Sequence, residues 1–561
     1  MEGISLMDQP PTLLERHREI LDGALHAIAT REYYSAYPES PSPRVYGETA
    51  AAEGQVAFEG WLGSTFLVST PGAEGTVSTE KSPFGLPLDV AYPRMTEAGV
   101  PALLEAAVAG RREWRDAEPD GRAGVCLEIL ARLHGRVFEL ANAVQHTSGQ
   151  AFVMAFQAGG THALDRALES IAYSYSEMTR VPPSAVWEKP GRGEPLRMEK
   201  TFTVVPRGVA LVIGCNTFPT WNSWPGLFAS LVCGNPVVVK PHPGAVLPLA
   251  ITVQVCQEVL AEWGFDSHLV TLAAEDPADG LARRLATDPA VKLIDFTGSN
   301  AFGQWLETNA TQAVVFTEKA GVNSVVIDST DSFRGMCGNL AFSFALYSGQ
   351  MCTTPQNVYV PAAGIETDDG HKSFDDVVGG VGAAMNGLLG DDARAVEILG
   401  GVVNDGVLER VSAVDSAVVE SREIVHPAFE DAVVRTPALV ALDESDTSVY
   451  GSECFGPVSY FIRTAGTDAS ISRFRDTITE HGAMTAGVYS TDAGVLADMR
   501  EAALDAGVAL SENLTGRVYV NQSAAFSDFH GTGANPAANS SYVDAAYVAP
   551  RFRIVQSRRH I

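Results

Sequence analysis

The chain has 561 residues, 46% of them hydrophobic and 8% aromatic, which is ample for a large folded core. Its 68 acidic residues outnumber 39 basic ones, and a surface with a net charge of −29 repels phosphate backbones, so nucleic acid is not expected as a partner. The seven cysteines are scattered without a CxxC pair, which argues against a disulfide framework or a metal site. We find no signal peptide and no long apolar run, and expect a cytoplasmic protein without membrane contact.

The first third of the chain is predicted to be helical. Residues 13–29 form the first expected helix, and a loop rich in Pro, Ser and Tyr follows it up to about residue 60. Over residues 96–180, apolar side chains recur at helical spacing and predict long amphipathic helices. The stretch 181–200 contains several Pro and Gly residues. It is predicted to interrupt the helices and to carry the chain across to the section that follows.

From residue 201 onward, short β-branched runs alternate with helical segments. This alternation predicts a parallel sheet covered on both faces, a doubly wound α/β layer over residues 201–320. A second α/β section is expected over 321–520, with strands at NVYVP, AVVES, ALVALD, GPVSYFI and AGVYS. The tail ends in RFRIVQS, an alternating strand that is expected to complete a sheet, possibly on a neighbouring subunit.

Two residues could carry covalent chemistry. Cys352 lies in SGQMCTT, between small and polar neighbours, where an exposed thiol near backbone N–H groups can act as a nucleophile. Glu318 follows a predicted strand, where a carboxylate can act as a general base toward water. Taken alone, a single cysteine is usually structural and a single glutamate is usually a surface ion-pair partner.

Two strand ends could meet a nucleotide. In VKLIDFTGSN, a strand leads into Gly298 and Ser299, and a helix expected over 300–309 would present its free N–H groups to a phosphate. Lys240 ends the strand of PVVVKP, at the sheet edge where α/β proteins bind ligands. An ordinary serine helix cap and a surface lysine are the alternatives. We find no GxGxxG fingerprint in this layer, so a standard Rossmann pyrophosphate loop is not supported.

Each of these signals is weak alone, but the order in which they occur along the chain is specific. The chain resembles the aldehyde dehydrogenase superfamily over about residues 100–561, and 34 residues separate Glu318 from Cys352, a spacing that the superfamily shares. Within it, the stretches HTSGQAF, IGCNTFPTWN and LYSGQMCTTPQN are similar to the phenylacetic acid degradation aldehyde dehydrogenases. The motifs that carry the resemblance are CNTFP (215–219), PVVVKP (236–241), FTGS (296–299), TEKAG (317–321), SGQMC (348–352) and ECFGP (453–457).

The resemblance implies two doubly wound α/β domains with a small oligomerisation arm, and a homodimer or homotetramer. Residues 1–60 would be an N-terminal extension. Residues 61–185 and 206–319 would bind the cofactor, and 320–520 would form the catalytic domain. Residues 186–205 and 521–561 would supply the arm and the C-terminal strand.

The resemblance also implies roles for single residues. Cys352 would attack the aldehyde and form a thioester, and Glu318 would activate the water that releases the acid. The amide donor to the oxyanion is expected at Asn216, with Thr217 as the alternative, because Thr217 stands directly before Phe-Pro where relatives have asparagine. The expected cofactor contacts are Lys240, Gly298, Ser299, Glu453 and Phe455.

Two further departures from the family pattern concern the cofactor. Relatives that prefer NAD often carry a glutamate three residues after the lysine, but this chain has Pro243, with His242 beside it. Because no carboxylate stands there to repel a 2′-phosphate, NADP is expected over NAD. The second departure is Ala320, where relatives often have glycine.

The narrower likeness implies a coenzyme A-linked semialdehyde, 3-oxo-5,6-dehydrosuberyl-CoA semialdehyde, as the substrate in phenylacetate degradation. Since the chain has no room for a fused hydratase domain, a separate ring-opening hydratase is expected as a functional partner. One alternative is a semialdehyde dehydrogenase of another aromatic route, such as benzoyl-CoA breakdown. An alternative of a different class is a non-catalytic structural or binding member of the fold.

Overall fold

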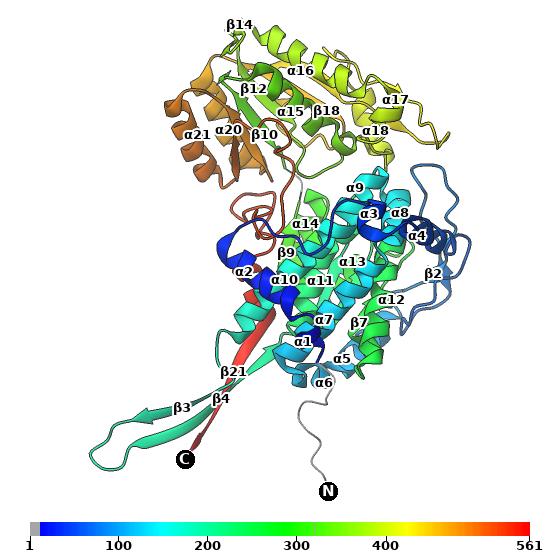
Figure 1. The fold of residues 1–561 in the computed structure, drawn as a ribbon, viewed down its shortest axis with the longest axis vertical. Coiled ribbons are helices and arrows are strands. Elements are labelled where there is room, and N and C mark those ends of the chain that lie inside the picture. The colour runs from blue at the N-terminus through cyan, green and yellow to red at the C-terminus, as the bar shows by residue number, and fades with distance from the viewer. Residues whose placement is uncertain (1–11, 320) are drawn as a thin grey trace.

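The computed structural model describes residues 12–319 and 321–561 of the chain. Two α/β lobes lie one above the other, and a ribbon of antiparallel strands projects from the lower lobe (Figure 1). Residues 1–11, within the expected N-terminal extension, and Ala320 lie outside the described residues.

The helices expected before residue 180 are present, and they cover the lower lobe. The first expected helix is divided at His17, where φ is −105° and ψ is 11°, so it forms two helices. Thr12 and Glu15 form a reciprocal capping box at its start. The main helices here are α1 (Leu13–Arg16), α2 (Arg18–Thr30), α5 (Val100–Ala109), α7 (Glu118–Gly135), α8 (Val137–Ser148) and α10 (His162–Thr179).

The lower lobe is built on a parallel sheet of five strands in the order β7-β6-β5-β8-β9. These strands are β5 (Val209–Ile213), β6 (Val237–Lys240), β7 (Val270–Leu272), β8 (Val291–Thr297) and β9 (Val314–Glu318). Strands β5 and β6 are buried along their whole length, as a sheet covered on both faces requires. Helices α11 (Pro219–Val232), α12 (Leu247–Glu262) and α14 (Asn300–Asn309) connect the strands. A doubly wound layer, as predicted for 201–320, is therefore present over residues 209–318, whereas residues 201–206 belong to a separate antiparallel strand, β4 (Leu196–Pro206).

The upper lobe contains a second parallel sheet, of six strands in the order β17-β18-β12-β10-β19-β20. These strands are β10 (Ser324–Ile327), β12 (Asn357–Pro361), β17 (Ala438–Asp443), β18 (Val458–Thr464), β19 (Ala486–Tyr489) and β20 (Leu510–Glu512). Helices α15 (Phe333–Ala345), α16 (Phe374–Leu389), α20 (Thr467–His481) and α21 (Ala493–Ala506) belong to the same lobe (Figure 1). The strand expected at AVVES is wrong, because this stretch makes only an isolated bridge, between Val419 and Leu439.

The projecting ribbon combines a hairpin with the C-terminal strand. Strands β3 (Ser184–Lys189) and β4 (Leu196–Pro206) form the hairpin, so the Pro/Gly-rich stretch predicted as a break contains two strands around a turn. The expected strand at RFRIVQS is confirmed as β21 (Phe552–His560). It pairs antiparallel with β4 of its own chain, from Phe552 opposite Pro206 to His560 opposite Met198.

No helix among the described residues is both long enough and apolar enough to span a membrane.

Candidate active site

Cys352 lies on a tight loop that follows α15 and a short 3-10 turn, η3 (Leu346–Gly349). The three residues Tyr347, Ser348 and Gly349 have φ values of 54°, 50° and 66°. A left-handed conformation costs of order 1–3 kcal/mol for a residue with a side chain, so the surroundings must hold it. They do so in part through the buried Ser348 hydroxyl, which donates to the carbonyls of Gly400 and Arg435 at 3.1 and 3.0 Å.

The Cys352 loop is also fixed from outside. A Cβ atom at Gly349 would lie 2.5 Å from the carbonyl oxygen of Gly456, so only glycine allows the loop to pack against the ECFGP segment. The Asn323 side chain donates to the carbonyl of Cys352 at 2.7 Å, while its own oxygen accepts from two backbone N–H groups. The nucleophile predicted from the sequence is thus held in a rigid loop.

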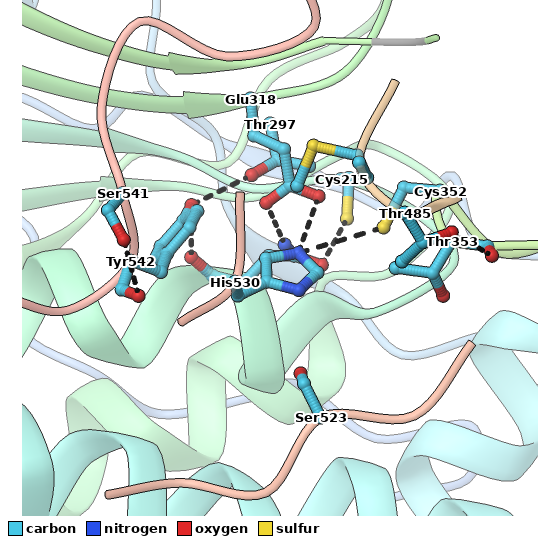
Figure 2. Close-up of polar contacts among 12 residues, drawn as sticks. Cys215, Thr297, Glu318, Cys352, Thr353, Thr485, Ser523, His530, Ser541 and Tyr542 are labelled. Atoms are coloured by element: carbon cyan, nitrogen blue, oxygen red, sulfur yellow. Dashed lines mark hydrogen bonds and ion pairs between the residues drawn. The ribbon is translucent and has the colours of Figure 1, made fainter. Parts of the chain in front are cut away.

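Cys352, Glu318 and His530 form a compact polar cluster (Figure 2). The Nε2 atom of His530 lies 3.2 Å from Oε1 of Glu318 and 3.9 Å from Sγ of Cys352. Glu318 ends strand β9 and is 1% exposed, His530 is 4% exposed, and Cys352 is partly buried. The structure therefore brings the two predicted catalytic residues together, around a histidine that the sequence did not point to.

Asn222 and Cys215 border the cluster on another side. The Asn222 amide nitrogen donates to Oε2 of Glu318 at 2.9 Å. The side-chain oxygen of Asn222 accepts from the thiol of Cys215 at 3.6 Å. Burial raises the pKa of Cys215 to about 11, so this second cysteine stays a protonated thiol at neutral pH.

The surroundings of Cys352 oppose its ionisation. Burial of the thiol, followed by the charge of the neighbouring Glu318 carboxylate, raises the pKa of Cys352 well above its usual value. A thiolate is the nucleophilic form of cysteine. A reaction at Cys352 therefore requires a group that accepts the thiol proton or balances the negative charge of the thiolate.

The expected oxyanion donor Asn216 is placed elsewhere. Its amide nitrogen donates to the carbonyl of Thr147 at 2.9 Å, in helix α8, and Asn216 is not among the described residues that line the cavity at Cys352. The alternative, Thr217, is likewise absent from the described residues that line this cavity. The side-chain amide that lies beside Glu318 and lines the cavity with Cys352 is Asn222, in the first turn of α11.

The expected cofactor residues lie at the carboxyl edge of the lower sheet and beside the cleft between the lobes. Lys240 ends β6, is buried, and forms an ion pair with Glu275 just after β7. Gly298 follows β8, and the exposed Ser299 caps α14 by accepting from the backbone N–H of Phe302 at 3.4 Å. A strand-end lysine and a helix N-terminus are groups that suit the phosphates and riboses of a dinucleotide, so these residues fit such a cofactor.

Glu453 lines a cavity of about 220 Å³ that extends from the first turn of α14 to the upper lobe. Burial raises the pKa of Glu453 to about 7, and the nearby Arg410 opposes this rise. Phe455 is half-buried, and its carbonyl accepts from the Arg410 guanidinium at 2.8 Å. Of the two predicted residues of the ECFGP segment, Glu453 therefore lines this cavity, and Phe455 is not among its described lining residues.

Cys352 opens into a larger cavity, of about 480 Å³. Its walls combine aromatic side chains with acidic ones, and residues from the N-terminal segment at 33–39 contribute to them. The aromatic part includes Tyr33, Tyr34, Phe218, Trp221 and Phe342, and the acidic part includes Glu39, Asp165 and Glu397.

Comparison with known proteins identifies the family of the chain. The model of the aldehyde dehydrogenase family matches residues 82–542, and the chain belongs to this family. Vanillin dehydrogenase from Pseudomonas fluorescens is 25% identical over 436 residues, 76% of this chain and 84% of the relative. Succinate-semialdehyde dehydrogenase from Paenarthrobacter nicotinovorans is 25% identical over 405 residues, 70% of this chain and 83% of the relative.

A solved structure from Burkholderia multivorans, described as an NAD-dependent aldehyde dehydrogenase, is similar over the whole chain. It is 54% identical, covers 99% of this chain and 100% of its own, and superposes with a TM-score of 0.96. The aldehyde dehydrogenase fold expected from the motifs is therefore confirmed.

The sequence reasoning missed His530 and Asn222. His530 lies in AFSDFHGTGANPAANSS, a segment without helical or alternating periodicity, and such loops often carry functional residues. Asn222 follows the CNTFP motif by only three residues, within TWN. Two signals could have indicated these residues: a histidine in an irregular segment, and a second asparagine near the motif.

Proposed function

We propose that the chain oxidises an aldehyde to a carboxylic acid through a thioester on Cys352. The observation that carries the proposal is that Cys352 and the Glu318 carboxylate both contact His530, while Cys352 and His530 line one cavity. In this reaction the Cys352 sulfur attacks the carbonyl carbon, and Glu318 later accepts a proton from the water that cleaves the thioester. A bound nicotinamide cofactor would accept the hydride whose loss from that carbon converts the adduct to the thioester.

We further propose Lys240, Gly298, Ser299, Glu453 and Phe455 as the residues that hold this cofactor, and NAD as the preferred form. The preference reverses the expectation of NADP. Although position 243 lacks a carboxylate, Glu275 places one directly on Lys240 and would repel a 2′-phosphate bound there. The NAD-dependent relative with 54% identity supports the same choice.

For the substrate, we propose a semialdehyde linked to coenzyme A, as the resemblance to phenylacetate-degrading enzymes implies. A cavity of about 480 Å³ suits the acyl part of such a molecule, while the nucleotide part would have to stay outside. A free aromatic aldehyde is the second candidate. It is favoured by the aromatic walls, by the acidic residues that would repel phosphates, and by the vanillin dehydrogenase relative.

The test measures NAD and NADP reduction with a panel of free aromatic aldehydes, free semialdehydes and coenzyme A-linked semialdehydes. We expect turnover that Cys352→Ala abolishes, together with a higher kcat/KM for NAD than for NADP. In Glu318→Gln, deacylation slows, so mass spectrometry should find a substrate adduct on Cys352.

Turnover retained in Cys352→Ala would refute the mechanism and favour a non-catalytic role for this cysteine. Faster turnover of free aromatic aldehydes than of all thioesters would favour the second substrate class. Preferred turnover of a semialdehyde from benzoyl-CoA breakdown would favour the other aromatic route.

We also propose that the chain works as a homodimer or homotetramer in the cytoplasm. The projecting ribbon supports an assembly, because it exposes Val186, Leu196, Ile554 and Val555. Supply of the semialdehyde by a separate ring-opening hydratase remains part of the phenylacetate proposal.

A further inference from the structure

His530 occupies the centre of the active-site cluster, and its position is tightly determined. Its backbone exchanges two hydrogen bonds with Tyr542, at 3.2 and 2.9 Å. Its ring packs edge-on against Trp221, with the ring centroids 4.6 Å apart. These contacts hold the imidazole so that Nε2 faces both Glu318 and Cys352 (Figure 2).

The geometry also indicates how a proton can move within the cluster. When the ring carries its hydrogen on Nδ1, the Nε2 lone pair faces the Cys352 sulfur and also a carboxylate oxygen at 3.2 Å, and the second contact is unfavourable. A proton transferred from the thiol to Nε2 removes this repulsion, because the new N–H can be shared by the Glu318 carboxylate and the Cys352 sulfur. A protonated imidazole here would place one positive charge between two groups that are both negative when Cys352 ionises.

We propose that His530 is a further catalytic residue, which holds the proton lost by Cys352 and balances the resulting thiolate against Glu318. In this step the S–H bond of Cys352 breaks and an N–H bond forms on the imidazole, with no change of oxidation state. The ring then carries hydrogens on Nδ1 and Nε2, and the thiolate is ready to attack the carbonyl carbon. The catalytic context rests on the proposed function, but the thiolate itself does not.

None of the other described titratable groups around the cluster can both accept the thiol proton and supply a positive charge. Glu318, from β9, can accept the proton, but it then becomes a neutral carboxylic acid and supplies no positive charge to balance the thiolate. Cys215 stays protonated, since burial raises its pKa to about 11. Tyr542, whose ring lies 5.7 Å from the imidazole ring, has a hydroxyl whose pKa burial raises well above its usual value, so it too stays neutral.

Two further charged residues, Arg166 and Glu453, lie farther from the imidazole and do not stabilise the thiolate. Arg166 lies over the Trp221 ring at 5.5 Å and forms an ion pair with Glu169. Glu453, the remaining carboxylate near Cys352, adds negative charge when ionised and disfavours the thiolate. Among the described residues, His530 is therefore the group in contact with Sγ that can supply a positive charge.

The experiment measures the rate of iodoacetamide alkylation at Cys352 against pH, by peptide mass spectrometry, without substrate or cofactor. The variants are His530→Gln, His530→Ala and Glu318→Gln, with His134→Gln as a matched control outside the site. We expect both His530 variants to alkylate at least tenfold more slowly at pH 7, with the midpoint of the pH profile about one unit higher or more. Added imidazole should restore the rate in His530→Ala.

Equal slowing at every pH with an unchanged midpoint would overturn the proposal, because it would assign His530 a structural role. So would slowing in Glu318→Gln without slowing in the His530 variants, which would make Glu318 the proton acceptor. Far-UV circular dichroism of each variant checks its fold. Alkylation requires no turnover. The experiment can therefore test whether His530 stabilises the Cys352 thiolate even if the protein shows no activity in the aldehyde assays.

Discussion

At the scale of single residues, two asparagines compete for one role beside Cys352. The Asn222 nitrogen carries two hydrogens, one of which is donated to Glu318, and the second can reach an oxyanion that forms in the same cavity. The Asn216 nitrogen is directed to the Thr147 carbonyl in α8. We therefore expect Asn222, and not Asn216, to stabilise the developing negative charge.

The matched variants Asn222→Ala and Asn216→Ala test this assignment. Loss of an oxyanion donor typically lowers kcat by about 10²–10³-fold, and we expect this loss for Asn222→Ala only. Because Asn222 also contacts Glu318, the measurement is the pre-steady-state burst of cofactor reduction, which precedes deacylation. A large loss in Asn216→Ala, with a normal burst in Asn222→Ala, would restore the role expected from the sequence.

At the scale of elements, the Cys352 loop depends on glycine where two segments meet. Gly349 has a φ of 66°, and its Cα approaches the backbone of Gly456 so closely that a Cβ would lie 2.5 Å from a carbonyl oxygen. The contact joins the nucleophile loop to the segment that carries Glu453. Both the backbone conformation and the close approach exclude a side chain.

Gly349→Ala should therefore lower both the melting temperature and kcat. The left-handed conformation alone costs about 1–2 kcal/mol for alanine, and the contact with Gly456 adds to that. Gly379→Ala is the control, since this glycine lies inside α16, where a Cβ would meet nothing within 4 Å and alanine is favoured over glycine. If Gly349→Ala melted and turned over like Gly379→Ala, the loop would be less constrained than its geometry indicates.

At the scale of the whole molecule, one buried ion pair ties the C-terminal segment to the lower sheet. Arg551 donates to both oxygens of Asp295 in β8, at 2.8 and 2.6 Å, and Tyr547 donates to the same carboxylate at 2.7 Å. Upstream of this anchor, the chain crosses β9 through a bridge between Glu318 and Ala538, and this path delivers His530 to the site. The anchor and the site thus share one segment.

Arg551→Met should leave a buried carboxylate unpaired. Breaking such a pair from one side costs about 3–5 kcal/mol, which urea unfolding monitored by intrinsic fluorescence can detect. The double variant with Asp295→Asn removes the uncompensated charge, so it should recover part of the loss. Equal stability of the wild type and Arg551→Met would show that the C-terminal segment is held by its other contacts.

The sequence by itself determined most of the lower-lobe elements and the two central catalytic candidates, but it missed the hairpin of β3 and β4 and predicted a strand at AVVES that is absent. The alternation of short β-branched runs with helices identified the lower sheet, because a strand covered on both faces must be apolar throughout. The small and polar neighbours of Cys352 indicated a reactive thiol. The strand that precedes Glu318 indicated a carboxylate at a strand end. The order of the motifs indicated the family.

Only the tertiary structure decided which groups surround them. His530 is 212 residues from Glu318 and 178 residues from Cys352, and it reaches them through an irregular segment that has no periodic signal. The direction of the Asn216 amide and the pairing of Lys240 with Glu275 likewise depend on neighbours from other elements. Local patterns encode the secondary structure, whereas contacts between distant segments arise only when the chain packs. This is why the sequence could point to Cys352 and Glu318 but not to His530 or Asn222.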